Sequence, residues 1–300
     1  MAAAPAKPDS ASRPPREHYN SDAEATWYQW LSLSLLLGID GVMALWLVEL
    51  IPLWAMALTL PVLYVRCALS VHELMHVRPA DRVLWIQRLM MVLESPFCVG
   101  YREYRDIHLR HHRFAGTEKD PEFFQIEGGH FRAFCHAMMS SEIACAYWLK
   151  EHGLDRRLAF GIVVRATCFV AIAVNFPWAF LAYLVVMRIA IGGSNFLFHH
   201  VLHQRSGEYG SFALRPPSWI DFVSRVVLGA DMRHIVFEHD AHHAWQLVKA
   251  GRLPGLLEDY PKAGFTATPA VAEGELTDVI VPQDEEIQAA EIGSRIVNSV

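Results

Sequence analysis

The amino-acid sequence predicts an all-α integral membrane protein, in which four transmembrane helices form two hairpins that carry a helical cap on the cytoplasmic side. Three observations lead to this fold class. Hydrophobic residues make up 53% of the 300-residue chain, and its mean hydropathy is +0.19. The apolar residues are gathered into two long blocks, and lysine and arginine crowd the segments outside those blocks.

The first apolar block runs from Trp27 to Val71 and contains three charged residues, Asp40, Glu49 and Arg66. A transmembrane helix needs about 20 residues to cross a hydrocarbon core of about 30 Å, so this block is long enough for two spans. The segment "ELIP" lies near its middle and predicts the turn between them. The first block is therefore expected to form the first hairpin.

The second apolar block runs from Leu158 to Phe198, and its only charged residues are Arg165 and Arg188. The segment "NFPW" interrupts it near the middle, where a proline ends one helix and begins the next. The tips of both hairpins are uncharged or acidic, whereas basic residues lie at the other ends. By the positive-inside rule, both termini and the middle of the chain are expected in the cytoplasm.

The terminal segments differ in composition from the apolar blocks. Residues 1–26 are rich in proline, alanine and charge, and residues 264–300 are acidic and poor in aromatic side chains. Such segments cannot bury a core, so both are expected to be disordered tails. Residues 27–263 are then the membrane domain. The net charge of −6 comes largely from the C-terminal tail, and nothing in the sequence indicates a nucleic-acid partner.

Histidine is the most informative residue type in this chain. Eleven of its sixteen histidines fall in four short stretches. These stretches are His72 and His76 in HELMH; His108, His111 and His112 in HLRHH; His199, His200 and His203 in NFLFHHVLH; and His239, His242 and His243 in HDAHH.

The spacing within these stretches suits metal binding. Residues three or four apart share one face of a helix, so each stretch directs two or three imidazoles toward one point. Two stretches lie at the predicted cytoplasmic ends of spans, and the other two follow each hairpin, so all four can meet outside the bilayer. Eight or nine imidazoles exceed the ligand number of one ion, so two metals are predicted. Imidazole suits Zn, Cu, Fe and Ni alike, and the ligand type leaves the metal open.

The pattern H-x(3,4)-H, H-x-x-H-H, H-x-x-H-H on two membrane hairpins resembles the membrane fatty acid desaturase superfamily, which includes acyl desaturases, lipid hydroxylases and carotenoid ketolases. The resemblance covers about residues 27 to 260. It implies a non-haem di-iron centre that uses O2 to remove hydrogen from an unactivated C–H bond. The iron ligands that it implies are His72, His76, His108, His111, His112, His239, His242 and His243.

Acyl desaturases also carry N-x-x-x-H on the last span, which Asn195 and His199 match. The resemblance implies that His199 is a further ligand and that Asn195 holds a metal-bound water. His203 lies one helical turn beyond His199, which favours a supporting or alternate ligand, whereas His200 is turned about 100° away and is expected to be structural.

Carboxylates near the boxes are candidates to orient the ligands. Asp120, in the run "GTEKDPEFF", and Glu238, beside HDAHH, could each accept the second N–H of a metal-bound imidazole. The other interpretation of Asp120 is a simple Asp-Pro turn. Asp40 lies inside the first span, where it could line a substrate tunnel, pair with Arg188 or bond a neighbouring helix.

Two apolar segments outside the blocks predict helices that lie in the membrane interface. They are residues 83–100 and residues 219–230, each with a few polar positions. Packing against the cytoplasmic cap is the alternative for both. An interfacial position would place the entry for a lipid substrate beside the metals.

The leading hypothesis is an O2-dependent membrane di-iron enzyme that desaturates a fatty acyl chain, with a hydroxylase or ketolase of a lipid, carotenoid or alkane as the alternative. The chain has no C-x-x-C pair, no flavin fingerprint and no haem-binding module, so electrons must come from an external donor such as a ferredoxin, a rubredoxin or a cytochrome b5-like protein. HELMH also matches H-E-x-x-H, which predicts a zinc protease with Glu73 as general base. That interpretation leaves three boxes without a role, and a metal transporter would require more ionisable residues at mid-bilayer.

Overall fold

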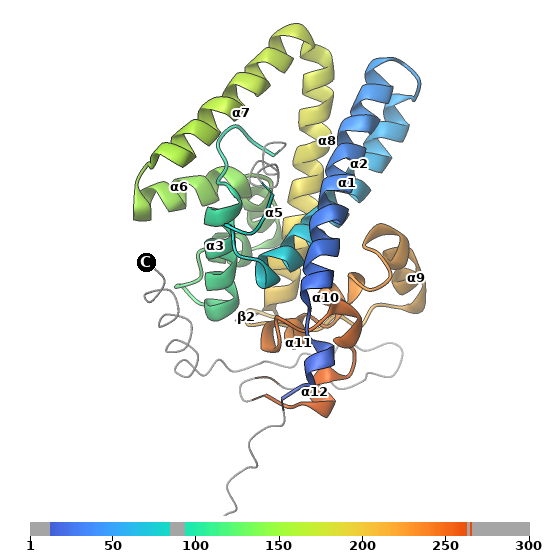
Figure 1. Ribbon diagram of the computed structural model, residues 1–300, viewed down its shortest axis with the longest axis vertical. Helices are drawn as coiled ribbons and strands as arrows, with labels where there is room; N and C mark the ends of the chain where they lie inside the picture. The colour runs from blue at the N-terminus through green and yellow to red at the C-terminus, as the bar shows by residue number, and fades with distance from the viewer. Residues whose placement is uncertain (1–12, 85–93, 263–264, 266–300) are drawn as a thin grey trace, which may run out of the picture.

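Four long apolar helices dominate the computed structural model, which describes residues 13–84, 94–262 and 265 (Figure 1). They are α1 (Asp22–Leu47), α2 (Leu53–Val77), α7 (Arg156–Asn175) and α8 (Pro177–Asn195), the last continued by the π-helical segment η3 (Phe196–Val201). Each is long and apolar enough to span a membrane. The predicted all-α fold with two transmembrane hairpins is confirmed.

Shorter helices gather at the end opposite the hairpin tips and form the cap (Figure 1). In chain order they are η1 (Arg16–His18), α3 (Tyr101–Phe114), α4 (Phe123–Ile126), α5 (His130–Met138), α6 (Ser140–His152), α9 (Ser218–Val227), α10 (Arg233–Phe237), α11 (His239–Ala244), η4 (Ala250–Arg252) and α12 (Leu256–Asp259). The described strand content is one small hairpin after η3, in which β1 (Gln204–Arg205) pairs antiparallel with β2 (Glu208–Tyr209).

The long helices begin and end where local chemistry requires. Ser21 and Glu24 form a capping box at the start of α1, which satisfies free backbone N–H groups of the first turn. The Asp155 carboxylate accepts the Leu158 N–H at 2.8 Å and caps α7. Pro177 occupies the first position of α8, where its missing N–H costs no hydrogen bond.

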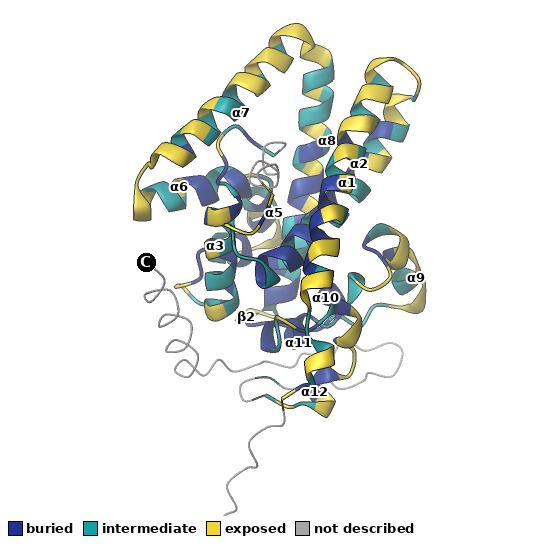
Figure 2. Ribbon diagram, in the orientation of Figure 1, coloured by how far each residue is buried: buried dark blue, intermediate teal, exposed yellow. Residues whose placement is uncertain are grey.

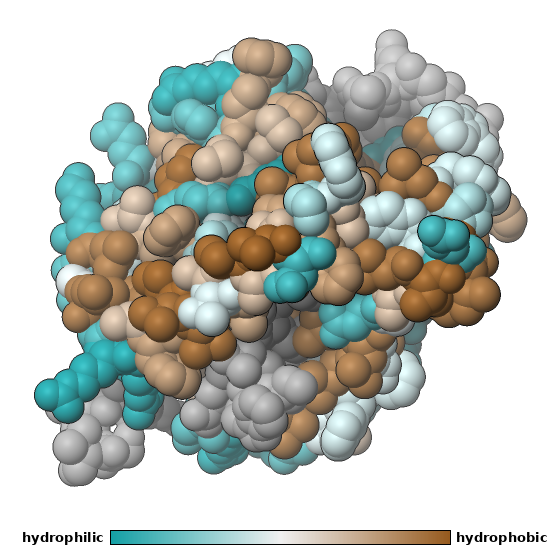
Figure 3. Space-filling model, turned by 90° about the horizontal axis from the view of Figure 1, so that it is seen from above, coloured by the Kyte–Doolittle hydropathy of each residue, from teal (hydrophilic) through white to brown (hydrophobic). Residues whose placement is uncertain are grey.

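The outer faces of the long helices carry large exposed apolar side chains, as the yellow ribbon of α7 shows in Figure 2. Phe160, Val163, Val170 and Val174 of α7 are all more than 60% exposed. Brown and tan apolar residues cover much of the face seen from the hairpin tips (Figure 3). Apolar area of this extent requires an apolar surrounding, and a lipid bilayer supplies one.

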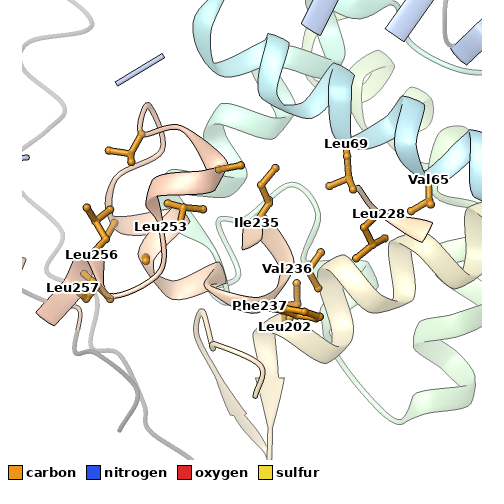
Figure 4. Packing of buried hydrophobic residues seen from close by; sticks show 14 residues of the cluster. Val65, Leu69, Leu202, Leu228, Ile235, Val236, Phe237, Leu253, Leu256 and Leu257 are labelled. Atoms are coloured by element: carbon orange, nitrogen blue, oxygen red, sulfur yellow. The ribbon is translucent and has the colours of Figure 1, made fainter. Parts of the chain in front are cut away.

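A hydrophobic cluster attaches the last part of the chain to the base of α2 (Figure 4). Val65 and Leu69 of α2 point toward Leu228, and Leu202 lies beside Phe237 (Figure 4). All five are buried, and the cluster continues through α10, α11, η4 and α12. Burial of each such side chain stabilises the fold by about 1.5–3 kcal/mol, so the cluster fixes α11 against the end of α2.

The start of the chain is hydrogen-bonded to the segment that follows α11. The Asn20 N–H donates to the Leu247 carbonyl, and the Lys249 N–H donates to the His18 carbonyl, both at 2.9 Å. An ion pair between Lys249 and Glu24 adds to this contact. The folded region therefore begins before Trp27, where the apolar block predicted its start, because these polar contacts order residues that bury little apolar surface. Residues 1–12 and 266–300, the rest of the predicted tails, lie outside the described residues.

The predicted interfacial segments have different outcomes. Half of residues 83–100, namely 85–93, lie outside the described part of the chain. Residues 219–230 largely coincide with α9, and its side chains Trp219, Phe222, Val223 and Val226 are between 48% and 69% exposed. Their spacing of three, four and seven residues puts them on one face, which fits a helix lying in the membrane interface.

Arg188 in α8 pairs with Glu142 of α6, and the suggestion that it pairs with Asp40 is wrong. Its guanidinium donates to Glu142 Oε2 at 2.9 Å and to the Met138 carbonyl at 2.8 Å. The contact ties α6 to the last transmembrane helix, because a charge inside an apolar bundle requires a partner of opposite sign.

Replacing Glu142 by alanine is expected to destabilise the protein by about 3 kcal/mol, because it leaves the Arg188 charge unpaired among the helices. Chemical denaturation in detergent, followed by circular dichroism, measures this loss. Glu151→Ala is the matched control: its ion pair with Arg110 is more exposed, and its loss should cost at most about 1 kcal/mol. Equal losses in the two variants would contradict the special role of the Arg188 pair.

Candidate metal centre

Four helical elements bring the histidine stretches to one place at the base of the hairpins. HELMH forms the last turns of α2, HLRHH lies on α3, and HDAHH forms most of α11. His199 and His200 lie in η3, and His203 lies two residues beyond its last residue, Val201. The hydrophobic cluster and the hairpin packing hold these elements together, so residues far apart in the sequence become neighbours.

The first group of imidazoles comes from α2, α3 and α11. The candidate ligand atoms of His72, His76, His108 and His112 all lie within 4.8 Å of one another, and His242 joins His72 and His76 in an overlapping set. His76 Nε2 lies 3.1 Å from His108 Nε2. Five imidazoles thus surround one small volume.

The second group comes from α3, the end of η3 and α11. The ligand atoms of His111, His203 and His243 lie within 4.8 Å of one another. His203 is central, because its Nε2 lies 3.1 Å from His111 Nε2 and 2.9 Å from His239 Nε2. His199 and His111 form a further set with a carboxylate, Glu122.

Each of the two H-x-x-H-H boxes divides its histidines between the two groups. His108 and His112 of α3 belong to the first group and His111 to the second. In α11 the division is reversed, since His242 joins the first group while His239 and His243 face the second. Residues four apart share a helix face and the remaining histidine is turned away from them, so one box can serve two adjacent metals.

Hydrogen bonds fix which nitrogen of the second group faces inward. The Nδ1 atoms of three rings donate outward to oxygen acceptors: His111 to Asp120 at 2.9 Å, His203 to the Gly210 carbonyl at 2.6 Å, and His239 to the Ile235 carbonyl at 3.0 Å. A neutral imidazole that donates from Nδ1 has a lone pair at Nε2. Three lone pairs therefore converge on one point, and this arrangement suits a shared cation.

The first group contains buried ring nitrogens that lack hydrogen-bond partners among the described residues. Both ring nitrogens of His112 and of His242 are buried without a hydrogen-bond partner among the described residues, and so is Nδ1 of His76. Buried polar atoms are almost always satisfied, and each one that is not costs about 1–3 kcal/mol. Metal coordination would satisfy these nitrogens, so the residues present fit a metal in each group.

The residues around the groups confirm one predicted orienting contact and correct another. Asp120 accepts the hydrogen bond from His111 and is 4% exposed, as the orienting role predicted. Glu238 instead pairs with Arg215 at 3.0 Å, and no hydrogen bond between its carboxylate and a histidine is found among the described residues. Glu73 lies with its Oε1 atom 3.2 Å from His72 Nδ1.

His200 and Asn195 occupy the margin of the site. His200 Nδ1 lies 2.8 Å from the Ile126 carbonyl and its Nε2 lies 2.7 Å from His130, so both nitrogens have partners and neither faces a group. This agrees with a structural role. The Asn195 amide donates to Ser140 Oγ at 2.6 Å. Its role in holding a water stays a prediction.

Burial controls the protonation of the site. Burial lowers the pKa of His239 to about 3. It also lowers the pKa values of His108, His112, His203, His242 and His243. His111 is the exception. Burial disfavours charge on His111 too, but the Asp120 carboxylate outweighs this and raises its pKa. Burial raises the pKa of Glu122 to about 7. Most of the imidazoles are thus neutral, the form that binds metals.

The metal-free protein is expected to lose stability as the pH falls below about 6.5. Folding lowers the pKa values of these histidines. At a pH between the lowered values and about 6.5, the unfolded chain therefore binds more protons than the folded chain does. The free energy of unfolding is therefore greatest above that pH. Below it, each histidine with a lowered pKa reduces the free energy of unfolding by up to about 1.4 kcal/mol per pH unit. Thermal unfolding of chelator-treated protein in detergent measures the effect. His242→Gln should weaken the pH dependence and the exposed His152→Gln should not; a midpoint independent of pH would contradict the expectation.

A cavity that is partly open to the outside lies beside both groups. His72, His111 and His199 line it together with apolar side chains such as Ala68, Leu69, Val71 and Val99. Polar residues at the wall include Tyr64, Glu94, Ser141 and Asn195. An apolar cavity with a few polar groups beside a metal centre is typical of a site for an apolar substrate.

The fold and the site define a class of protein: a four-span helical membrane protein with two adjacent groups of buried histidines. The fatty acid desaturase family model matches residues 44–179, which include HELMH and HLRHH, so this part of the chain is similar to the membrane fatty acid desaturase superfamily. No curated protein and no solved structure matches the chain. The family consists of oxidoreductases of the desaturase and hydroxylase type.

Sequence reasoning missed one residue of the site and ranked another too low. Glu122 lies only two residues beyond Asp120, in the quoted run DPE, but spacing alone gives no direction for its side chain. His203 was ranked after His199, although its Nε2 makes the closer contacts. The ranking assumed a regular α-helix, whereas His199 lies in the π-helical segment η3, which no spacing pattern predicted.

Proposed function

We propose that this protein is an O2-dependent membrane di-iron oxidoreductase that desaturates a fatty acyl chain. The observation that carries the proposal is the convergence of Nε2 lone pairs from His111, His203 and His239, next to the first group of five imidazoles, three of which have buried nitrogens without a hydrogen-bond partner. Neutral imidazoles in this number support two metal ions. The family supports iron as the metal.

The chain holds and orients the proposed irons through two ligand sets. His72, His76, His108, His112 and His242 form the first set, and His111, His199, His203, His239 and His243 form the second. Two bound irons would supply an oxidant, formed with O2, that is strong enough to break an unactivated C–H bond. Asp120 and the carbonyls of Gly210 and Ile235 keep the imidazoles of the second set aimed at the metal.

The cavity supports a long apolar substrate. Its wall combines apolar side chains of α2 with imidazoles of both groups, so a methylene chain in the cavity would lie against the metals. Positioning of this kind lowers the entropic cost of bringing a C–H bond to the oxidant. Exclusion of water from an apolar cavity also protects a reactive centre.

Electrons are proposed to come from an external donor such as a ferredoxin, a rubredoxin or a cytochrome b5-like protein, and the metal centre is proposed to face the cytoplasm. The five cysteines are free thiols in the structure, and the sequence carries no cluster motif. The basic residues outside the apolar blocks support the proposed orientation.

The zinc protease interpretation loses support in the structure. Glu73 is fully buried, its Oε1 lies 3.2 Å from His72 Nδ1, and its carboxylate joins His72, His76 and His242 in one candidate set. A protease that used this set would leave the second group of histidines without a role. Glu73→Gln should therefore weaken the enzyme without abolishing it. A proteolytic activity that Glu73→Gln abolishes while the metal content stays normal would favour the protease.

Expression in a host that makes both fatty acids and carotenoids tests the function, with mass spectrometry of the total lipid as the measurement. The wild-type chain should produce fatty acids that have lost two hydrogens, and a His111→Ala control should not. A product with one added oxygen would identify a hydroxylase or ketolase instead, and the molecule that carries it would identify the substrate. Identical lipids from the wild type and His111→Ala would contradict both activities.

A further inference from the structure

Glu122 is a buried carboxylate at the second histidine group. It lies between the Asp-Pro turn and α4, is 1% exposed and lines the cavity. Its candidate ligand oxygen lies within 4.8 Å of the ligand nitrogens of His111 and His199. Carboxylates of this type are rarely buried unless they are paired or bind a metal.

The contacts of Glu122 leave most of its binding capacity unused. Oε1 lies 3.6 Å from His199 Nε2 and 3.5 Å from Gln125 Nε2, both at or beyond the limit of a hydrogen bond. Oε2 is buried without a hydrogen-bond partner. Within the described part of the chain no lysine or arginine pairs with Glu122. A buried carboxylate in this position requires a cation to offset its desolvation.

The neighbouring carboxylate has a different task, and the local backbone separates the two. Asp120 Oδ2 accepts the hydrogen bond from His111 Nδ1, while its Oδ1 accepts the Glu122 N–H at 2.8 Å. Asp120 therefore supports His111 from the outer side of the ring. The same turn directs Glu122 toward the inner side, where His111 and His199 present their ligand nitrogens.

We propose that Glu122 is a carboxylate ligand of the second metal, beside the imidazoles of His111 and His199. This inference rests on the proposed di-metal function and adds a ligand to it. The second metal would then have mixed nitrogen and oxygen ligation, from a carboxylate whose nearest printed contacts lie at 3.5 and 3.6 Å. The carboxylate of the first group, Glu73, differs because its Oε1 lies 3.2 Å from His72 Nδ1, within hydrogen-bond distance. Carboxylate oxygen is a hard, negatively charged ligand, so it favours the higher oxidation state of iron at that position. The two irons of the pair are therefore inequivalent.

A role limited to hydrogen bonding is the alternative, in which Glu122 only orients His199. The two roles respond differently to substitution. Glutamine retains a carbonyl oxygen and the ability to hydrogen-bond His199, but it lacks the negative charge. Histidine at this position supplies a neutral nitrogen ligand in place of the oxygen.

The test measures iron content and Mössbauer spectra of purified, reduced protein that was loaded with iron-57. The chains to compare are the wild type, Glu122→Gln, Glu122→His and the control Glu127→Gln, whose residue pairs with Arg132 away from the site. The wild type and the control should bind two irons in two distinct ferrous environments. Glu122→Gln should bind the second iron at least about ten-fold more weakly and lose one ferrous signal. Glu122→His should recover the second iron with an altered signal.

Retention of two irons and of both ferrous signals in Glu122→Gln would overturn the proposal, since a hydrogen-bonding role survives that change. Circular dichroism and gel filtration in detergent establish that each variant is folded. Binding of the first iron in each variant is an internal control, because the first site forms only in folded protein. A wild-type protein that binds no iron or one metal would overturn the di-iron function itself. That outcome is visible before any variant is compared.

Discussion

Replacement of His203 by alanine is expected to remove the metal of the second group and to abolish activity. His203 Nε2 lies within 3.1 Å of Nε2 of both His111 and His239, so its loss removes the central ligand of the group. Changes to residues that only support metal ligands already cost about 10- to 100-fold in affinity or activity, and loss of a ligand should cost more. Metal analysis of purified protein and lipid analysis of expressing cells measure the two effects.

The matched control for His203 is His200→Ala, three residues earlier on the same segment. Both nitrogens of His200 bond outside the metal groups, to His130 and to the Ile126 carbonyl. His200→Ala should retain two metals and most of the activity, with a loss of stability alone. If His200→Ala lost metal and His203→Ala retained it, the placement of these histidines would be wrong.

Replacement of Asp120 by alanine is expected to weaken binding of the second metal by about 10- to 100-fold. Its carboxylate holds the proton of His111 Nδ1, which keeps the lone pair of His111 at Nε2 and aimed at the site. Titration of metal-free protein with ferrous iron gives the two affinities separately. The first metal should bind almost normally, because its ligands do not contact Asp120.

Asp155→Ala serves as the control for Asp120→Ala. Asp155 caps α7 through the Leu158 N–H and lies outside the metal groups. Its loss should lower stability by about 1 kcal/mol and leave both iron affinities unchanged. An unchanged second affinity in Asp120→Ala would show that Asp120 serves only the Asp-Pro turn.

The features that sequence predicted well depend on short-range spacing and on composition. Two apolar blocks with few charges are enough to predict four spans, because the thickness of a bilayer sets the length of a helix. The H-x-x-H-H boxes are informative for a similar reason, since helical geometry decides which histidines share a face. Asp120 could be proposed because it follows its box closely on the chain.

The features that sequence did not predict depend on long-range packing or on irregular backbone. The partner of Arg188 is Glu142, which lies in the cap, and the order of the polar groups along the spans gave no reason to choose it over Asp40. His199 and His203 were ranked on the assumption of a regular α-helix, but η3 is a π-helical segment. The side chain of Glu122 depends on a turn whose direction no periodic pattern encodes.

The contact between residues 18–20 and 247–249 bears on the order in which the protein is assembled. Synthesis makes the first hairpin before α11, so neither group of histidines can be complete until α11 has left the ribosome. The backbone bonds from Asn20 and His18 then close the last-made segment onto the first-made one, with HDAHH held immediately beside them. Loading of the proposed metals would therefore follow the synthesis of α11, because a nascent chain with both hairpins already in the bilayer still lacks HDAHH.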